Sequence, residues 1–181
     1  MKTLQDNFCL LRFGIITRLV QVSDAEFIYR LRSDKYLTRH IHPFDGTLED
    51  QIQWINGYKE REQQGKEFYF IYEKKGKPFG VNRIYSIEDN HGTTGSWICI
   101  PGSSPIDVLA TSIILYDLCF DELQFEKVFY DTRKDNTSAL KVNRALGGVY
   151  LYEKNEDLYF ELLPENYHSV RDRLLKTWRI K

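Results

Sequence analysis

The stretch Thr93–Leu123, TTGSWICIPGSSPIDVLATSIILYDLCFDEL, decides the fold because it predicts a strand that leads directly into a long buried helix. Residues 96–100 are apolar and rich in β-branched and aromatic side chains, which is typical of a strand. The Pro101-Gly102 pair interrupts that strand. Residues 106–123 place apolar side chains at helical spacing around most of the surface, so this segment predicts a largely buried helix.

The start of this helix has the composition of a well-defined N-terminus. Ser104 suits the cap position, Pro105 the first helical position and Asp107 the first turn. Such a turn aims unpaired backbone N–H groups and the positive end of the helix dipole at one spot, where an anion such as a phosphate can bind. An ordinary strand-to-helix connection explains the same residues without a ligand, so both interpretations stay open.

Length and composition restrict the class of protein. The chain has 181 residues, with 42% hydrophobic and 28% charged residues, which predicts one globular domain over 1–181 with a helical extension at 164–181. The net charge of -1 argues against nucleic acid and against anionic membrane as partners. Aromatic residues make up 14% of the chain and can line a pocket or fill a sheet core.

Targeting signals, cysteines and histidines point to the cytoplasm and away from a metal centre. No apolar run approaches the roughly 20 residues of a membrane span, and the first residues lack the pattern of a signal peptide. The three cysteines are an odd number and form no CxxC pair, which favours a reducing compartment. The four histidines are scattered, so we expect no metal site.

Periodicity and turn residues predict the remaining elements. We expect a strand or hairpin over 8–20, a helix over 23–34 with a Ser23–Glu26 capping box, a helix from Thr47 to about 63, strands over 66–74, 77–89 and 127–133, a helix over 136–146, a hairpin of 149–154 with 157–163, and a last helix over 164–181. Helices inserted among hairpins favour a mixed α/β fold with helices on both faces of the sheet.

Several residues in this order resemble the GCN5-related N-acetyltransferase superfamily, over roughly residues 10–163. The resemblance is closest to the branch of ribosomal-protein alanine acetyltransferases and amino-sugar acetyltransferases. It rests on Leu31-Arg32-Ser33-Asp34, Trp54, Phe79-Gly80, Gly95-Ser96-Trp97-Ile98, Asn136-Thr137-Ser138-Ala139, Asn143 and Gly147-Gly148. Each match is weak alone, and their common order and spacing carry the assignment.

The resemblance implies a mixed, mostly antiparallel central sheet whose fourth and fifth strands, here 96–100 and 127–133, splay apart to admit acetyl-CoA. It implies that the pantetheine arm pairs with the first of these strands and that the pyrophosphate lies on the loop before the long helix. The implied cofactor-binding residues are Ile98, Cys99, Ile100, Gly102, Ser103, Ser104, Ile106, Asp107, Val108, Asn136 and Asn143. The implied reaction is attack of a neutral amine on the thioester.

The sequence departs from the family pattern at three places. The phosphate loop has one glycine at its start and carries the negative charge of Asp107. Asn143 stands where many members have the tyrosine that protonates the thiolate, and Thr93 stands where a glutamate base is common. The candidate catalytic residues are therefore Asn143, Asp131 and His42, with a chain of water molecules as another route for the proton.

The expected acceptor is a primary amine on a small molecule, for example a nucleotide-linked amino sugar. The candidate substrate-binding residues are Arg83, Tyr85, Trp97 and His40, although each also suits a purely structural place in the sheet, core or loop. The alternatives are a non-catalytic binding module of the same fold and an acetyltransferase of protein N-termini or ribosomal proteins. We expect a monomer or a homodimer.

Overall fold

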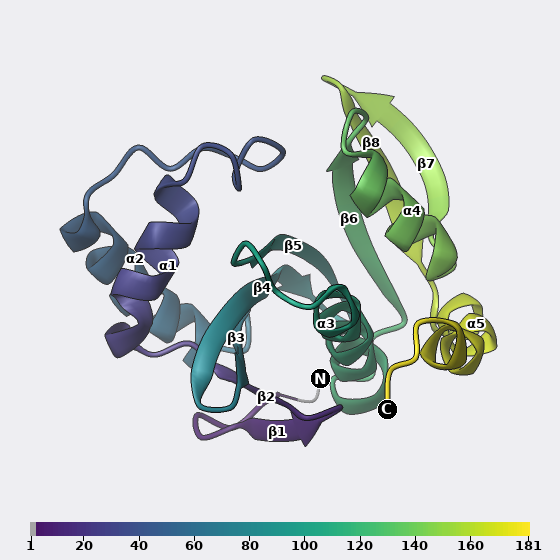
Figure 1. The fold of residues 1–181 in the computed structure, drawn as a ribbon, viewed down its shortest axis with the longest axis horizontal. Coiled ribbons are helices and arrows are strands. Elements are labelled where there is room, and N and C mark those ends of the chain that lie inside the picture. The colour runs from purple at the N-terminus through teal and green to yellow at the C-terminus, as the bar shows by residue number, and fades with distance from the viewer. Residues whose placement is uncertain (1–2) are drawn as a thin grey trace.

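The protein, a computed structural model that describes residues 3–181, is built on an eight-stranded sheet (Figure 1). The strand order is β1-β2-β3-β4-β5-β6-β8-β7. The strands are β1 (Cys9–Arg12), β2 (Ile15–Leu19), β3 (Phe68–Lys74), β4 (Lys77–Glu88), β5 (His91–Cys99), β6 (Lys127–Arg133), β7 (Val149–Lys154) and β8 (Asp157–Leu162). All neighbours pair antiparallel except β5 and β6, which confirms the mixed, mostly antiparallel sheet.

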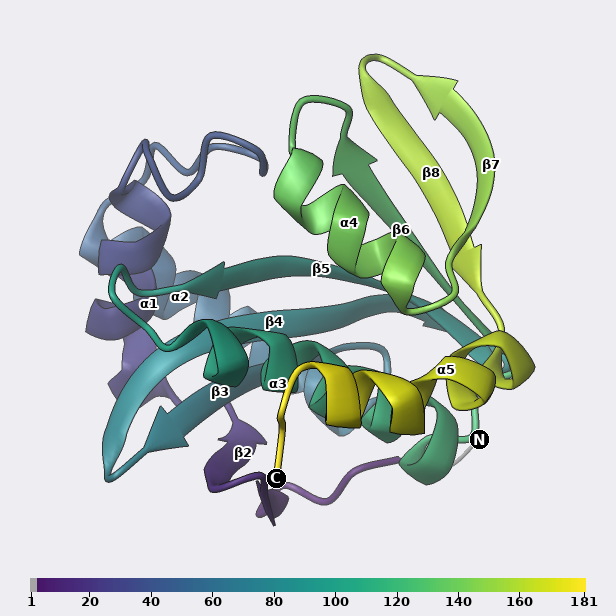
Figure 2. The same ribbon diagram turned by 45° about the vertical axis from the view of Figure 1, so that its right-hand side comes forward.

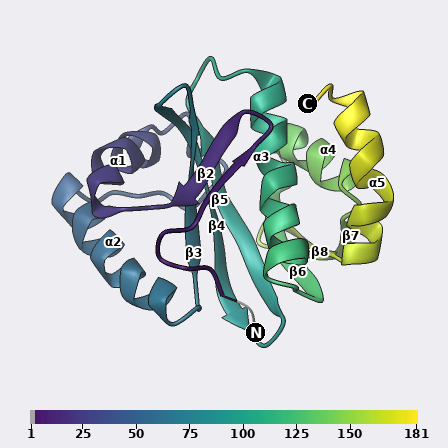
Figure 3. The ribbon, with the colours of Figure 1, turned by 90° about the horizontal axis from the view of Figure 1, so that it is seen from below.

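The helices cover both faces of the sheet, as the sequence predicted. They are α1 (Ala25–Ser33), α2 (Leu48–Gln63), α3 (Pro105–Asp117), α4 (Thr137–Ala145) and α5 (Pro164–Thr177). Figure 3 shows α1 and α2 on one side of β2–β5 and α3 and α5 on the other. The core is divided accordingly: Ile28, Ile55 and Tyr69 belong to one apolar cluster, and Phe70 and Ile113 to the other. Strand β3 is buried on both faces, which explains its unbroken FYFIY run.

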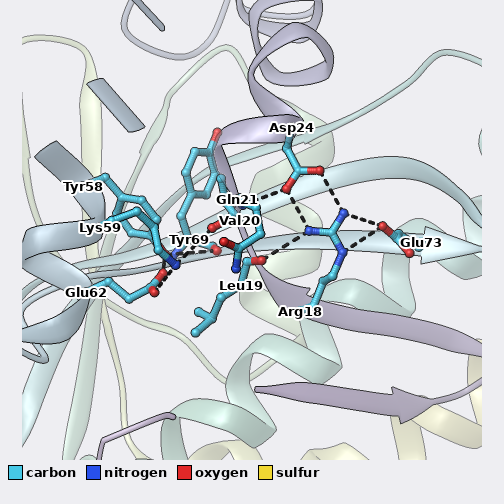
Figure 4. A network of polar contacts seen from close by, with 10 residues as sticks. All are labelled: Arg18, Leu19, Val20, Gln21, Asp24, Tyr58, Lys59, Glu62, Tyr69 and Glu73. Carbon is cyan, nitrogen blue, oxygen red and sulfur yellow. Dashed lines mark hydrogen bonds and ion pairs between the residues drawn. The ribbon is translucent and has the colours of Figure 1, made fainter. Parts of the chain in front are cut away.

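Polar networks fasten α1 and α2 to the sheet (Figure 4). The guanidinium of Arg18 on β2 donates to both carboxylate oxygens of Asp24, at 2.8 Å each, and to Glu73 on β3. Asp24 immediately precedes α1, so this pairing fixes the helix start against two strands. On α2, the buried Glu62 accepts hydrogen bonds from Tyr58 and Lys59.

Several boundaries differ from the sequence prediction, and the last helix ends at Thr177 instead of running to residue 181. The cap before α1 pairs Gln21 with Asp24 rather than Ser23 with Glu26, because a 3-10 turn over Val22–Asp24 precedes the helix. Strand β5 starts at His91, five residues earlier than expected, because Thr93 and Thr94 extend it despite their polarity. The long helix ends at Asp117 and continues as a π-helical turn over Leu118–Glu122. Within residues 3–181, every helix is too short or too polar to cross a bilayer.

Asp117, at the end of α3, ties the first strand to the last helix. Its side chain is almost fully buried and lies 2.7 Å from Nη1 of Arg12 on β1. It also accepts hydrogen bonds from Arg171 Nε at 2.5 Å and from the Tyr167 hydroxyl at 2.8 Å, both on α5. A buried carboxylate is stable only when such partners replace its water, so these contacts hold three distant segments in one arrangement.

Replacing Asp117 with alanine should lower the free energy of unfolding by about 3–5 kcal/mol, because two arginines lose the buried carboxylate that neutralises them. Denaturant unfolding followed by circular dichroism measures this change. Asp121→Ala is the matched control: Asp121 lies one turn further along and is half exposed beside His168, so its loss should cost less than about 1 kcal/mol. Equal losses in the two variants would contradict the role assigned to Asp117.

Candidate functional site

Strands β5 and β6 form a fork. They pair in parallel only through His91–Lys127, Gly92–Val128 and Thr93–Phe129. Beyond these pairs β5 stays bonded to β4 and β6 to β8, so residues 94–99 of β5 face no strand on the side of the fork. Figure 2 shows β6 rising away from β5, with α4 beside the opening. The splayed strands, expected as the fourth and fifth, are therefore present as β5 and β6. Their numbers are one higher because the N-terminal segment contributes two strands.

A β-bulge lies where the fork opens. Two steps along β4, from Val81 to Arg83, face three steps along β5, from Gly95 to Ile98. The extra residue lies in Ser96-Trp97, and Ser96 adopts a left-handed backbone with φ of 57°. Bulges bend a strand and leave backbone groups unpaired, and this one lies next to the point where the β5–β6 pairing ends.

Four cavities run through the fork one after another, each sharing residues with the next. A groove of about 480 Å³ between α3 and α4 adjoins a cavity of about 110 Å³ in the fork, which adjoins a cavity of about 380 Å³ on the other side and then one of about 60 Å³. Trp97 and Asn136 link the first two, Ser96 and Asp131 link the second and third, and Arg83 links the last two. A molecule in the groove can therefore meet one in the 380 Å³ cavity.

The predicted cofactor-binding residues divide among the groove, the helix start and the core. Cys99, Ser103, Val108 and Asn136 line the groove. Ile100, Gly102, Ser104 and Asp107 line a recess of about 190 Å³ on the other side of the loop, together with Lys74 and Lys77. The side chain of Ile98 packs in the core beneath α1 and α2, which leaves only its backbone for a ligand. Ile106 is exposed at the start of α3 and lines none of these cavities.

The negative charge of Asp107 is neutralised within the protein. Nζ of Lys74, at the end of β3, lies 2.5 Å from Oδ1 of Asp107. The β3–β4 hairpin brings this lysine to Asp107, so the negative charge in the expected phosphate loop has a partner within the protein. Pro105 starts α3 without an N–H of its own, so the first free helical amides are those of Ile106 and Asp107.

The fork cavity holds polar side chains that sequence reasoning missed. Tyr116 of α3 and Tyr130 of β6 both line it, and the Tyr130 hydroxyl is buried with no hydrogen-bond partner in residues 3–181. Burial raises the pKa of both hydroxyls, so they stay protonated. Asn143 also lines the cavity and donates from Nδ2 to Thr132 Oγ1 at 2.8 Å. The two tyrosines follow apolar periodicity, so their sequence pattern is that of core residues.

The predicted acceptor residues lie together on the far side of the fork. His40, Arg83 and Tyr85 line the 380 Å³ cavity, together with the candidate catalytic residues His42 and Asp131. The loop between α1 and α2 supplies the histidines, β4 supplies Arg83 and Tyr85, and β6 supplies Asp131.

Trp97 occupies a different place from the other predicted acceptor residues. Its indole N–H donates to Thr111 Oγ1 of α3 at 2.9 Å, and its side chain lines the fork and the groove instead of the 380 Å³ cavity.

Asp131 has an altered acidity. Partial burial raises its pKa, the nearby Asp157 carboxylate raises it further, and His42 acts in the opposite direction. Asp131 is the carboxylate that lines both the fork cavity and the 380 Å³ cavity. A carboxylate of raised pKa at this junction suits a group that accepts a proton. Residues 3–181 contain no cluster of three or more metal-ligating side chains.

Comparison with known proteins agrees with this geometry. The family model described as acetyltransferase (GNAT) domain matches residues 15–149. A search of curated proteins found no match.

Solved structures of acetyltransferases share the whole architecture. The apo structure of FdhC, described as a nucleotide-linked sugar GNAT, is 28% identical, covers 96% of this chain and 98% of its own, and has a TM-score of 0.83. RimJ from Mycobacterium smegmatis in complex with CoA-disulfide is 17% identical over 95% of this chain and 93% of its own, with a TM-score of 0.77. Spermidine N-acetyltransferase from Vibrio cholerae with CoA and spermine is 15% identical, covers 86% of this chain and 98% of its own, and has a TM-score of 0.72.

Gly148 is required by the packing at the fork, because a Cβ there would overlap the Tyr130 hydroxyl and lie 3.0 Å from the Asn143 carbonyl oxygen. Gly148→Ala should therefore lower the free energy of unfolding by about 1–3 kcal/mol. Gly57→Ala, in the middle of α2, has its nearest contact at 3.5 Å and should instead stabilise by about 0.5–1 kcal/mol. Thermal unfolding of both variants tests the pair, and the packing argument fails if Gly148→Ala is neutral.

Proposed function

The chain belongs to the acetyltransferase family of the GNAT type, and on that premise we propose that it transfers an acetyl group from acetyl-CoA to a primary amine on a small molecule. The observation that carries the proposal is that the groove, the fork cavity and the 380 Å³ cavity follow one another. The groove and the fork cavity share Asn136, and the fork cavity and the 380 Å³ cavity share Ser96 and Asp131. Two reactants that enter from opposite sides meet where β5 has no partner strand. The same proposal places the reaction in the cytoplasm, where free cysteines remain reduced.

The residues of the groove fit acetyl-CoA. The unpaired edge of β5 can hydrogen-bond an amide-bearing pantetheine arm as a strand would, and the apolar side chains of Val108, Leu109 and Val142 match its hydrocarbon parts. The free amides of Ile106 and Asp107 suit a pyrophosphate at the start of α3, where Lys74 already neutralises the Asp107 carboxylate. When bound, acetyl-CoA supplies the activated acyl group as a thioester.

The groups of the fork have distinct proposed roles. Asp131 accepts the proton that the ammonium form of the acceptor must lose before attack. Backbone N–H groups freed by the bulge at Ser96 stabilise negative charge on the acyl oxygen. Tyr130, with its unpartnered hydroxyl, gives a proton to the departing sulfur, the role that the sequence could not place. Asn143 donates a hydrogen bond to Thr132 and so positions α4 against β6 at the cavity wall.

The acceptor class we favour is a nucleotide-linked amino sugar. FdhC, named for such a sugar, is 28% identical over nearly the full length of both chains, whereas likeness to the spermidine and RimJ enzymes is below 20% and supports the fold alone. His40, His42, Arg83 and Tyr85 offer hydrogen-bond donors and stacking surfaces that suit sugar hydroxyls and phosphates.

The proposal is tested with purified protein in two measurements. Calorimetry should show acetyl-CoA binding with a Kd tighter than about 1 mM, and release of free thiol should appear with UDP- or dTDP-linked amino sugars in a panel that also contains polyamines and peptides with free N-termini. Binding without turnover of any amine would support a non-catalytic module instead. Turnover of peptides alone would support a protein N-terminal or ribosomal-protein acetyltransferase. Absence of binding would end the proposal.

Asp131→Asn should lower kcat by about 10²–10⁴-fold, because the base that accepts the proton is lost. In the unmodified protein the rate should fall as pH decreases through the raised pKa of Asp131, since only the carboxylate accepts a proton. The variant should lose this acid limb while its KM for acetyl-CoA stays the same. Asp172→Asn, on the exposed surface of α5, is the control and should keep the profile. An unchanged acid limb in Asp131→Asn would assign the base to another group.

A further inference from the structure

A smaller cavity opens behind the 380 Å³ cavity, here called the acceptor cavity, on the side away from the fork. It has a volume of about 60 Å³ and is lined by Arg32, Phe44, Gln51, Trp54, Tyr69 and Arg83. Arg32 and Arg83 also line the 380 Å³ cavity, so the two spaces meet between their side chains. The proposed reaction uses the other end of the acceptor cavity, where Asp131 faces the fork, and it leaves this end without a role.

Charge at this end is unbalanced toward the positive. The buried Glu67 lies 2.6 Å from Arg83 Nε through one oxygen and 2.7 Å from Arg61 Nε through the other. One carboxylate therefore serves two guanidinium groups. Arg32 has no carboxylate within ion-pair distance in the described part of the chain, and its Nη2 donates to the His42 carbonyl at 3.2 Å. The group as a whole retains two positive charges, which favours an anion beside it.

Neighbouring side chains hold the donors in place. The Arg83 guanidinium lies over the rings of Trp54 and Tyr85, 4.9 Å from each ring centre, which fixes its plane. The Tyr69 hydroxyl there is buried and lies close enough to Arg32 and Arg83 for both guanidinium groups to act on its pKa. Burial raises the pKa of Tyr69 to about 12, so the hydroxyl remains a donor. An arginine fork, a second guanidinium and a hydroxyl donor together form a site for an oxyanion.

The opposite wall of the acceptor cavity carries the opposite charge. Asp131, Asp157 and Arg133 line it there, and Nε of Arg133 forms an ion pair with Oδ1 of Asp157 at 3.6 Å. Asp131 has no ion-pair partner within residues 3–181, so the cavity presents a free carboxylate beside the fork, where an ammonium group approaches, and arginines beneath the α1–α2 loop. An acceptor with an amine at one end and an anion at the other complements both walls, whereas a polyamine would place a cation against Arg32.

We propose that the acceptor carries an oxyanion remote from its reacting amine, and that Arg32 and Arg83 bind this group where the two cavities meet. The inference rests on the proposed function for its assignment of the amine end. A phosphate ester, as in a nucleotide-linked sugar, and a carboxylate share the required chemistry.

Calorimetry with three amino sugars tests the proposal. Glucosamine 1-phosphate carries a phosphate, muramic acid carries a carboxylate, and glucosamine carries no anionic group. The full chain is titrated with saturating CoA present, so that phosphate sites of the cofactor are filled. At least one anionic sugar should bind about tenfold or more tightly than glucosamine, since a hydrogen bond to a charged group exceeds the 1.4 kcal/mol of a tenfold change. Which of the two binds more tightly identifies the source of the oxyanion.

Arg32→Gln should abolish this preference while leaving glucosamine binding unchanged. Arg30→Gln is the matched control, because Arg30 lies on the same helix and pairs only with the exposed Glu26. Arg83→Lys, which keeps the charge toward Glu67 and loses the planar fork, should weaken the anionic sugar several-fold. Equal binding of all three sugars, an unchanged preference in Arg32→Gln, or tighter binding of spermidine would overturn the proposal. Failure of acetyl-CoA to bind would instead count against the proposed reaction, since Arg32 lies across the fork from the groove.

Discussion

The structure depends on β5 and β6 being joined at one end and apart at the other. Three residue pairs close the base of the fork, and each strand keeps its other neighbour, β4 or β8. Backbone groups that lose a strand partner in a sheet interior must find water or a ligand. The fork therefore leaves backbone groups in the middle of the molecule without a strand partner. The bulge at Ser96 lies among them, at the point where two cavities meet.

Neighbouring elements keep the fork from closing. Tyr130 extends over Gly148, which has no side chain to resist it, and the Asn143–Thr132 hydrogen bond holds α4 against β6. On the other strand, Trp97 is tied to α3 through Thr111. Each strand is thus fixed to its own helix, and the space between them does not depend on contacts across it.

Local sequence signals predicted most of the elements, and long-range contacts explain what those signals missed. The β6 boundaries agree with the expected 127–133, and the Thr47–Asp50 capping box starts α2 as expected. The charge state of several sites depends on partners that the local sequence does not reveal: Lys74 neutralises Asp107, and Glu67 is shared by Arg61 and Arg83. Tyr130 alternates like any core residue, so its place in the wall of the fork cavity shows only where β6 has separated from β5. The family resemblance supplied the fork, which no single pattern in the sequence predicts.

The carboxylate of Asp117 joins residue 12 to residue 171, so the helix that begins at the proposed phosphate site is secured by both an early and a late part of the chain. During synthesis on the ribosome, α3 is complete long before α5 emerges. Until then, Asp117 has Arg12 as a partner and still lacks Arg171 and Tyr167. The contacts of Asp117 are therefore completed only when α5 is available, and a nascent chain arrested before residue 167 would expose the apolar surface of α3 that α5 covers.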